Sequence, residues 1–157
     1  MTTDAQRRAA ARPEKEVRHR ARESAVQMLY QWEVGRDPIS EVVLMFWTHG
    51  PSASQSQSVP DELRMFASML ANGVAGTVEA IDPMIAEAAE NWRIERMNVL
   101  DRLILRLAIY EFLHQPETPV KVIINEALEL ARTFSTDDSV RFINGILDAV
   151  RKTLQRE

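Results

Sequence analysis

The sequence predicts an all-α protein, a helical bundle of about seven helices. Apolar residues recur at three- and four-residue steps along almost the whole chain, and no stretch alternates with a period of two for long enough to form a sheet. Glycine is rare, with 5 in 157 residues, which also favours helix. We expect one domain over residues 14–157, preceded by a flexible basic arm over residues 1–13.

The first helix is expected over residues 14–34, ending near Gly35. Its apolar stripe consists of Val17, Ala21, Ala25, Met28, Leu29 and Trp32. Asp37 followed by Pro38 is typical of a capping residue with proline at the first helical position, so a short helix is expected over residues 38–47. Residues 48–58 (THGPSASQSQS) are polar and without a period, which indicates a loop.

The middle of the chain predicts two helices. Ser58 with Asp61 resembles a capping box and opens a helix whose apolar stripe consists of Leu63, Phe66, Leu70, Val74, Val78 and Ile81. Asp82 followed by Pro83 repeats the signal of a capped helix start. We therefore expect the chain to break there and to begin a separate helix that continues through Trp92.

Three helices are expected in the last third of the chain. Residues 97–113 are apolar on most sides, so that helix is expected at the centre of the packing. Thr118 followed by Pro119 starts the next helix, with Val120, Ile123, Ile124, Ala127, Leu130, Ala131 and Phe134 facing inward. The last helix covers residues 136–154 and buries Val140, Ile143, Leu147, Val150 and Leu154.

Charge is distributed unevenly along the chain. Residues 1–22 hold seven arginines and lysines against three acids, within a chain whose net charge is −4. A basic end on an acidic body is the layout of a protein that grips phosphates at one end. The alternative, a disordered solubilising tail, stays open for residues 1–13, where no apolar period exists.

The residues that carry chemistry in enzymes are missing or scattered. The chain has no cysteine and no glycine-rich phosphate loop, and its histidines, His19, His49 and His114, lie far apart without metal-ligand spacing. The pair Asp137–Asp138 is explained by the dipole of the helix that it begins. We therefore expect that the protein is not an enzyme and binds no cofactor or metal. Because the chain has no apolar stretch of about 18 residues, we also expect a cytoplasmic protein with no membrane contact.

Two positions of the last helix stand out. A helical wheel places Asp138, Arg141 and Gly145 opposite the apolar stripe, with Phe142 at its side beside Arg141. A half-exposed aromatic next to an arginine can act as a stacking platform for a base, although Phe142 could equally pack under a neighbouring helix. Gly145 lies inside a helix, where glycine is unfavourable and often marks a close approach by another backbone.

Several segments together resemble the NusB family of transcription antitermination factors. They are the residues Arg20-Ala21-Arg22-Glu23 with Gln27, Leu29 and Tyr30, then DRLILRLAIYE (101–111), INEALELAR (124–132) and DDSVRFINGILD (137–148). The resemblance spans about residues 17–150. It implies two three-helix halves plus a last helix, and no catalytic activity. It also implies binding to single-stranded boxA RNA of ribosomal RNA leaders together with the small-subunit ribosomal protein NusE, and indirect work with RNA polymerase and other elongation factors.

The resemblance also implies which residues make these contacts. Those for NusE are Tyr30, Glu95 and Asp101. Residue chemistry alone leaves other roles open for two of them: Tyr30 and Asp101 could be a buried hydroxyl with its acceptor, or an ordinary charge on a helix face. Nothing is carried over for residues 1–13 or for the serine-glutamine loop. The RNA contacts are Arg18, His19, Arg20, Arg22, Phe134, Asp138, Ser139, Arg141 and Phe142.

Two other functions remain open at this point. The chain could be a NusB-like RNA-binding module of a ribosomal RNA methyltransferase system, but no methyl-donor-binding motif follows it in the sequence. It could also be a helical protein-interaction module without an RNA role, in which case the basic arm would serve only solubility. Self-association is not determined by the sequence, although a homodimer that buries the RNA face would be one way to silence it.

Overall fold

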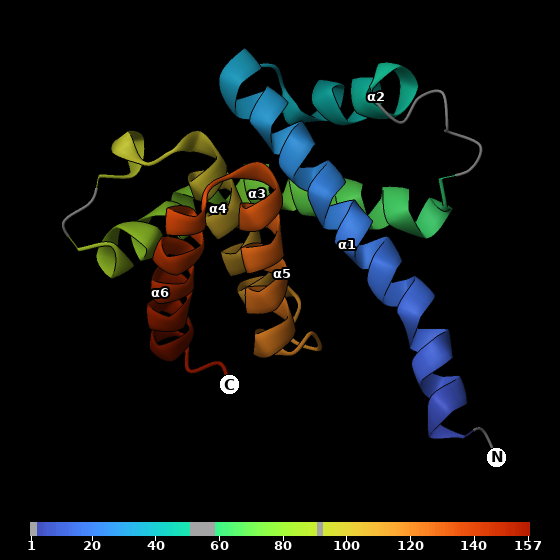
Figure 1. Cartoon of the computed structure of the whole chain (residues 1–157). Helices are drawn as coiled ribbons and strands as arrows, with labels where there is room; N and C mark the ends of the chain where they lie inside the picture. The colour runs from blue at the N-terminus through green and yellow to red at the C-terminus, as the bar shows by residue number, and fades with distance from the viewer. Residues whose placement is uncertain (1–2, 51–58, 91–92) are drawn as a thin grey trace.

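The computed structural model describes residues 3–50, 59–90 and 93–157, and for residues 4–13 it describes the backbone only. Within these residues the chain is helical throughout and forms no strand, so the predicted all-α class is confirmed. There are six described α-helices where we expected about seven. They are α1 (Asp4–Gly35), α2 (Ile39–His49), α3 (Asp61–Ala88), α4 (Val99–His114), α5 (Val120–Phe134) and α6 (Asp137–Thr153), with a 3-10 helix, η2 (Ile94–Arg96), before α4 (Figure 1).

The helices pack as two groups of three. Helices α1, α2 and α3 contact one another, as do α4, α5 and α6, and α3 joins the two groups because it contacts both α4 and α6 (Figure 1). The N-terminal part of α1 runs away from the other helices (Figure 1). None of the described helices is both long enough and apolar enough to cross a membrane.

Helix α4 lies at the centre of the packing, as predicted. Every residue from Leu103 to Phe112 is buried, and α4 contacts α1, α3, α5 and α6. A helix that is surrounded on all sides must either be apolar or pair each polar side chain with a neighbour. The polar residues of α4 therefore decide where its neighbours lie, as the site described below shows.

Helix α3 runs through Pro83, so the predicted break at Asp82–Pro83 is wrong. Proline inside a helix removes one backbone hydrogen bond and is normally disruptive. Here Ile81 and Ile85, on either side of it, are both fully buried, while Pro83 itself is exposed. Burial of one continuous apolar stripe outweighs the lost hydrogen bond. Trp92, the expected end of the separate helix, lies outside the described residues.

Three helix starts differ in detail from the prediction, because proline occupies the capping position itself. Pro38, Pro60 and Pro119 precede α2, α3 and α5 with extended ψ values of 139, 142 and 138°, and none of these helices has a side-chain cap. The carbonyl of each proline accepts the first helical hydrogen bond, for example from Val42 N to Pro38 O at 3.1 Å. Asp37 and Thr118 therefore do not cap; Ser58 lies outside the described residues.

Helix α1 begins at Asp4 rather than at residue 14. Residues 4–13 have no apolar stripe, but their alanines and arginines have high intrinsic helix propensity, which explains why the helix can extend beyond the packed region. The flexibility that we predicted for residues 1–13 stays a prediction.

Gly73 of α3 gives a direct test of this packing. The ring of Tyr110 on α4 lies so close to Gly73 that a Cβ there would overlap with it. We predict that Gly73→Ala lowers the free energy of unfolding by about 1–3 kcal/mol, because Tyr110 must move. Gly76, three residues on, is the matched control: nothing lies within 4 Å of its missing Cβ, so Gly76→Ala should raise stability by about 0.5–1 kcal/mol. Urea unfolding that gave both variants the same sign would contradict the packing.

Candidate nucleic-acid interface

The first turns of α6 present polar and aromatic side chains to solvent. Thr136 caps the helix, with its hydroxyl accepting from the backbone N–H of Ser139 at 3.2 Å. Asp138 and Arg141 are exposed, and Phe142 is half-buried at the edge of the core. The predicted orientation of this helix is therefore confirmed. Phe142 packs against the core and keeps part of its side chain exposed.

A pocket of about 310 Å³ adjoins this face. It lies between the first turns of α6 and the chain that leads from η2 into α4, and it brings together an aromatic ring, a guanidinium, an amide and carboxylates. Stacking surfaces next to hydrogen-bonding groups of this kind suit an unstacked nucleobase. The sequence did not reveal the contribution from η2 and α4, because they are distant in the chain. The pocket is lined by Arg96, Met97, Asn98, Asp101, Asp138, Ser139 and Phe142.

Two residues of this pocket hold the fold together. The carboxylate of Asp101 accepts a hydrogen bond from Ser135 Oγ at 2.7 Å and from Ser139 Oγ at 2.8 Å, which fixes the α5–α6 turn against the first turn of α4. Asp101 and Ser139 are each only 7% exposed. A side chain that contacts RNA or a partner protein directly must be accessible, and these two side chains are not. The contacts that the family resemblance implied for them are therefore left out of the proposed interface.

The arginines in the middle of α1 differ sharply in their surroundings. Arg20 is exposed, whereas Arg18 is half-buried with its guanidinium 5.1 Å from the centre of the Phe66 ring. Arg22 is only 2% exposed and donates from Nε and Nη2 to the two carboxylate oxygens of Glu111 on α4, at 2.9 and 2.8 Å. The predicted role of Arg22 as a phosphate contact therefore does not fit its position.

The sequence contains a signal for this burial that the expectation of phosphate binding overlooked. Arg22 stands three residues before Ala25 and seven before Leu29, on the buried side of α1, and Glu111 stands in a helix that is apolar on most sides. A cation on one buried stripe and an acid on another can be satisfied by pairing with each other.

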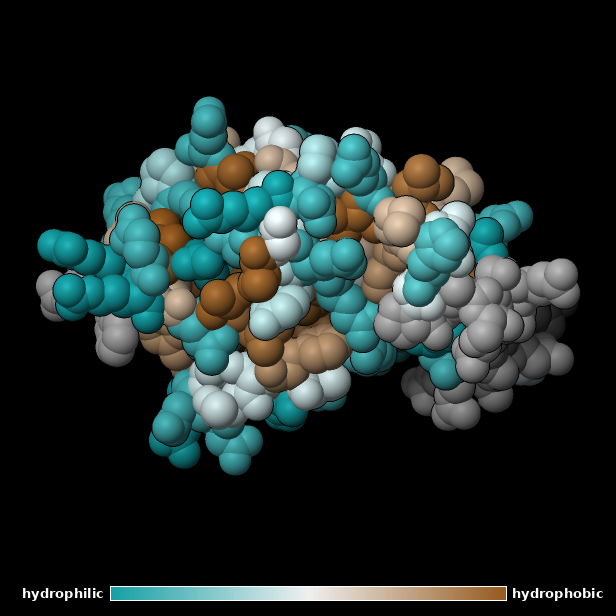
Figure 2. All heavy atoms as spheres, turned by 90° about the horizontal axis from the view of Figure 1, so that it is seen from above, coloured by the Kyte–Doolittle hydropathy of each residue, from teal (hydrophilic) through white to brown (hydrophobic). Residues whose placement is uncertain are grey.

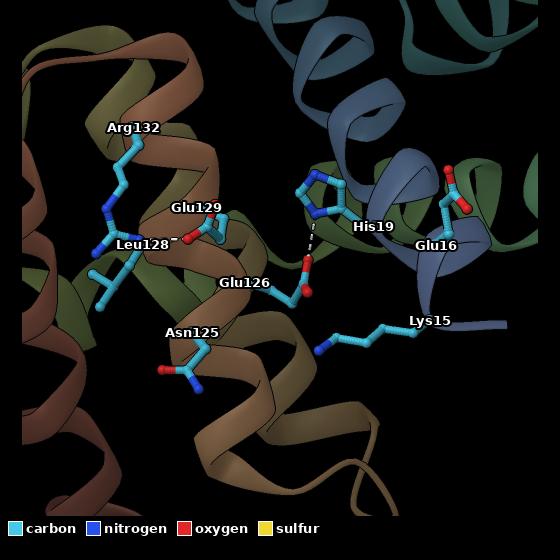
Figure 3. A pocket seen from close by; sticks show the side chains of 8 residues that line it. All are labelled: Lys15, Glu16, His19, Asn125, Glu126, Leu128, Glu129 and Arg132. Carbon is cyan, nitrogen blue, oxygen red and sulfur yellow. Dashed lines mark hydrogen bonds and ion pairs between the residues drawn. The ribbon is translucent and has the colours of Figure 1, made fainter. Parts of the chain in front are cut away.

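A groove of about 630 Å³ separates α1 from α5 (Figure 3). His19 of α1 faces Glu126 of α5 across it, with Nδ1 at 2.7 Å from the carboxylate, while its Nε2 lies 3.0 Å from Glu23. Lys15 points into the same groove (Figure 3). Glu129 and Arg132 form an exposed pair on its far side at 2.6 Å. Because charges of both signs line it, the groove as a whole does not favour an anion.

A second ionic network supports the elements that carry Tyr30 and Glu95. Arg102 donates to Glu33 of α1 at 2.8 Å and to the carbonyl of Ile94 in η2 at 3.1 Å, so it ties η2 to α1. Burial would lower the pKa of Arg106, but its bonds with Asp82 and Glu33 outweigh this effect and raise that pKa above its ordinary value. Tyr30 on α1 is 45% exposed, and Glu95 on η2 is also exposed.

Apolar side chains are also exposed where α1 ends and α2 begins. The upper face of the molecule shows apolar patches separated by hydrophilic side chains rather than one continuous apolar surface (Figure 2). Among the described side chains of α1 and α2, large apolar residues that are exposed include Val34 at 56%, Leu44 at 64% and Met45 at 48%.

Comparisons with known proteins agree on one family. A model described as the NusB family matches residues 19–152. Transcription antitermination protein NusB of Koribacter versatilis (strain Ellin345) is 43% identical over 90% of this chain and 92% of its own length. The protein of the same name from Symbiobacterium thermophilum is 42% identical over 85% of this chain and 88% of its own length.

Solved structures agree with this result. T. maritima NusB has a TM-score of 0.74 at 30% identity and covers 86% of this chain and 90% of its own. A crystal structure of antitermination factors NusB and NusE in complex with dsRNA has a TM-score of 0.73 at 20% identity, over 88% of this chain and 98% of the matched one, which shows a shared fold.

The buried pair Arg22–Glu111 predicts a large difference between neighbouring arginines. We expect Arg22→Ala to lower the free energy of unfolding by about 3–5 kcal/mol, because Glu111 would be left buried without its partner. The control Arg20→Ala removes an exposed side chain and should change stability by less than about 0.5 kcal/mol. Denaturant unfolding of both variants tests this, and similar small effects would mean that Arg22 is free to contact other molecules.

Proposed function

The chain belongs to the NusB family, and from this premise we propose that it is a transcription antitermination factor. It binds boxA-type single-stranded RNA of ribosomal RNA leaders together with the ribosomal protein NusE and so supports processive transcription of ribosomal RNA operons. Its relatives that match over nearly their whole length are antitermination proteins, which favours this function over a methyltransferase module. Their role in transcription also supports a cytoplasmic location.

The observation that carries the RNA part of this proposal is the face formed by the start of α6. Phe142 offers a ring for stacking, Arg141 a cation for phosphate or for a base edge, and Asp138 an acceptor for a base or sugar hydroxyl. Phe134, half-buried at the end of α5, extends the apolar part of this face. Arg96 and Asn98 add donors from across the pocket.

Residues 18–20, in the middle of α1, contribute charge to RNA binding. Both ring nitrogens of His19 lie against the carboxylates of Glu126 and Glu23, whereas Arg20 is exposed and Arg18 is half-buried, so these two arginines have some surface from which to attract phosphates. These cations add affinity that depends on salt, whereas the α6 face selects bases. The buried residues Arg22 and Ser139 stabilise the packing beneath residues 18–20 of α1 and the start of α6, respectively.

NusE binding is assigned to the surface that carries Tyr30 and Glu95. Both side chains are exposed, and the elements on which they lie are joined through Arg102. An acid on this surface fits a basic ribosomal protein. The chain works by binding alone: it holds RNA and NusE together, and the two ligands bind more tightly jointly than separately because they can share contacts. The chain interacts with RNA polymerase and other elongation factors indirectly, through its complex with RNA and NusE.

Substitutions of Phe142 separate stacking from packing. We predict that Phe142→Leu weakens binding of a boxA RNA by about 1–3 kcal/mol, because the aromatic face is lost. Phe142→Tyr keeps that face and should bind almost as the unsubstituted protein does. Both changes roughly conserve apolar volume, so each should alter stability by less than about 1.5 kcal/mol. RNA titrations and unfolding curves measure the two effects; a binding loss that only follows a stability loss would exclude a stacking role.

Charge reversal at Glu95 tests the partner surface. Glu95→Lys should weaken NusE binding by about three- to tenfold at low salt, through repulsion of a basic partner, and leave RNA binding by the free protein unchanged. Glu79→Lys, on an exposed acid of α3, is the matched control and should change neither. Equal effects of the two reversals on NusE affinity would show that only net charge matters and that the assigned surface is wrong.

A further inference from the structure

At Gly145 the backbone of α6 is exposed without a side chain to cover it. It lies in the interior of that helix, where glycine is less favourable than alanine, and it is exposed. A Cβ built at this position would meet nothing within 4 Å. No described part of the chain therefore requires the absence of a side chain here, and the open backbone faces solvent.

The side chains around Gly145 suit a nucleic-acid backbone. Arg141, one turn earlier, and Asn144 are exposed on one flank of Gly145, and the half-buried Phe142 lies on its other flank. Asp148, one turn later, is engaged by Arg151 at 2.7 Å and by Lys152 at 3.0 Å. Hydrogen bonds from Arg151 and Lys152 also lower the pKa of Asp148. The exposed backbone at Gly145 thus has the Arg141 guanidinium and the Asn144 amide near it, and the charge of Asp148 is compensated by two cations.

We propose that Gly145 is where the sugar–phosphate backbone of bound single-stranded RNA makes its closest approach to α6. This inference rests on the proposed function and adds a positioning element to it. Arg141 and Asn144, on one flank of Gly145, contact phosphate and ribose, while Phe142, on the other flank, stacks on the attached base. A side chain at position 145 would occupy the space that the ribose fills.

Gly76 of α3 provides a comparison within the same molecule. It too is exposed, lies inside a helix and has nothing within 4 Å of its missing Cβ. Three residues later, however, α3 carries the exposed acid Glu79, which repels phosphate. The two glycines share their geometry and differ in the charges around them, so a substitution at Gly76 controls for the general effect of adding a side chain.

The experiment compares Gly145→Ala, Gly145→Leu and Gly76→Ala in the full chain. Each is measured for urea unfolding, for affinity toward a boxA single-stranded oligonucleotide, and for affinity toward NusE. All three new residues are good helix formers, so the unfolding midpoints should stay level or rise. We expect Gly145→Ala to weaken RNA binding by about five- to tenfold and Gly145→Leu to weaken it further, because binding energy falls as the close contact is lost. Gly76→Ala should leave RNA affinity unchanged, and all three variants should bind NusE normally.

Other outcomes overturn the inference in distinguishable ways. RNA affinity that is unchanged in both Gly145 variants, with the unsubstituted chain binding RNA, removes Gly145 from the RNA path and leaves the proposed function standing. A loss of NusE affinity instead of RNA affinity assigns this surface to the protein partner. Failure of the unsubstituted chain to bind the oligonucleotide, with or without NusE, overturns the proposed function and the inference together.

Discussion

The burial of α4 on all sides is the constraint on which the rest of the structure depends. A surrounded helix can keep charged residues only where a neighbour supplies a partner, and the charged residues of α4 are paired in this way. Glu111 pairs with Arg22 of α1, and Arg106 pairs with Asp82 of α3. Asp101 accepts hydrogen bonds from the hydroxyls at the α5–α6 turn. Such pairs add little net stability but are costly to break, so we infer that they fix how the neighbouring helices dock.

Sequence periodicity predicted the all-α class and the central position of α4, because burial of an apolar stripe leaves a regular spacing. It failed where a local signal competed with packing. At Pro83 the core stripe of Ile81 and Ile85 continues across a residue that normally ends a helix. Arg22 shows the same competition: its place in a basic stretch indicates phosphate binding, whereas its spacing on the apolar stripe of α1 indicates burial, and its pairing with Glu111 agrees with burial.

The same internal pairs position the two outer surfaces. Asp101 fixes the start of α6 and with it the side chains of Asp138 and Phe142, while the next residue, Arg102, ties η2 and α1 together near Glu95 and Tyr30. The proposed RNA face and the proposed partner surface therefore both depend on contacts of two consecutive residues in the first turn of α4. The family resemblance named the residues of both proposed surfaces, but the sequence could not show that Asp101 and Ser139 are buried beneath them, since that depends on tertiary contacts.

The central claim is that RNA contacts the outer side of α6 and residues 18–20 of α1 while the paired residues of α4 remain internal. Amide chemical-shift mapping of the isotope-labelled chain during titration with boxA RNA tests this claim most directly. We predict perturbations that concentrate between Phe134 and Gly145 and between Arg18 and Arg20, with small changes along residues 103–112. Perturbations centred instead on Leu44 and Met45 of α2, with none at the start of α6, would contradict the account.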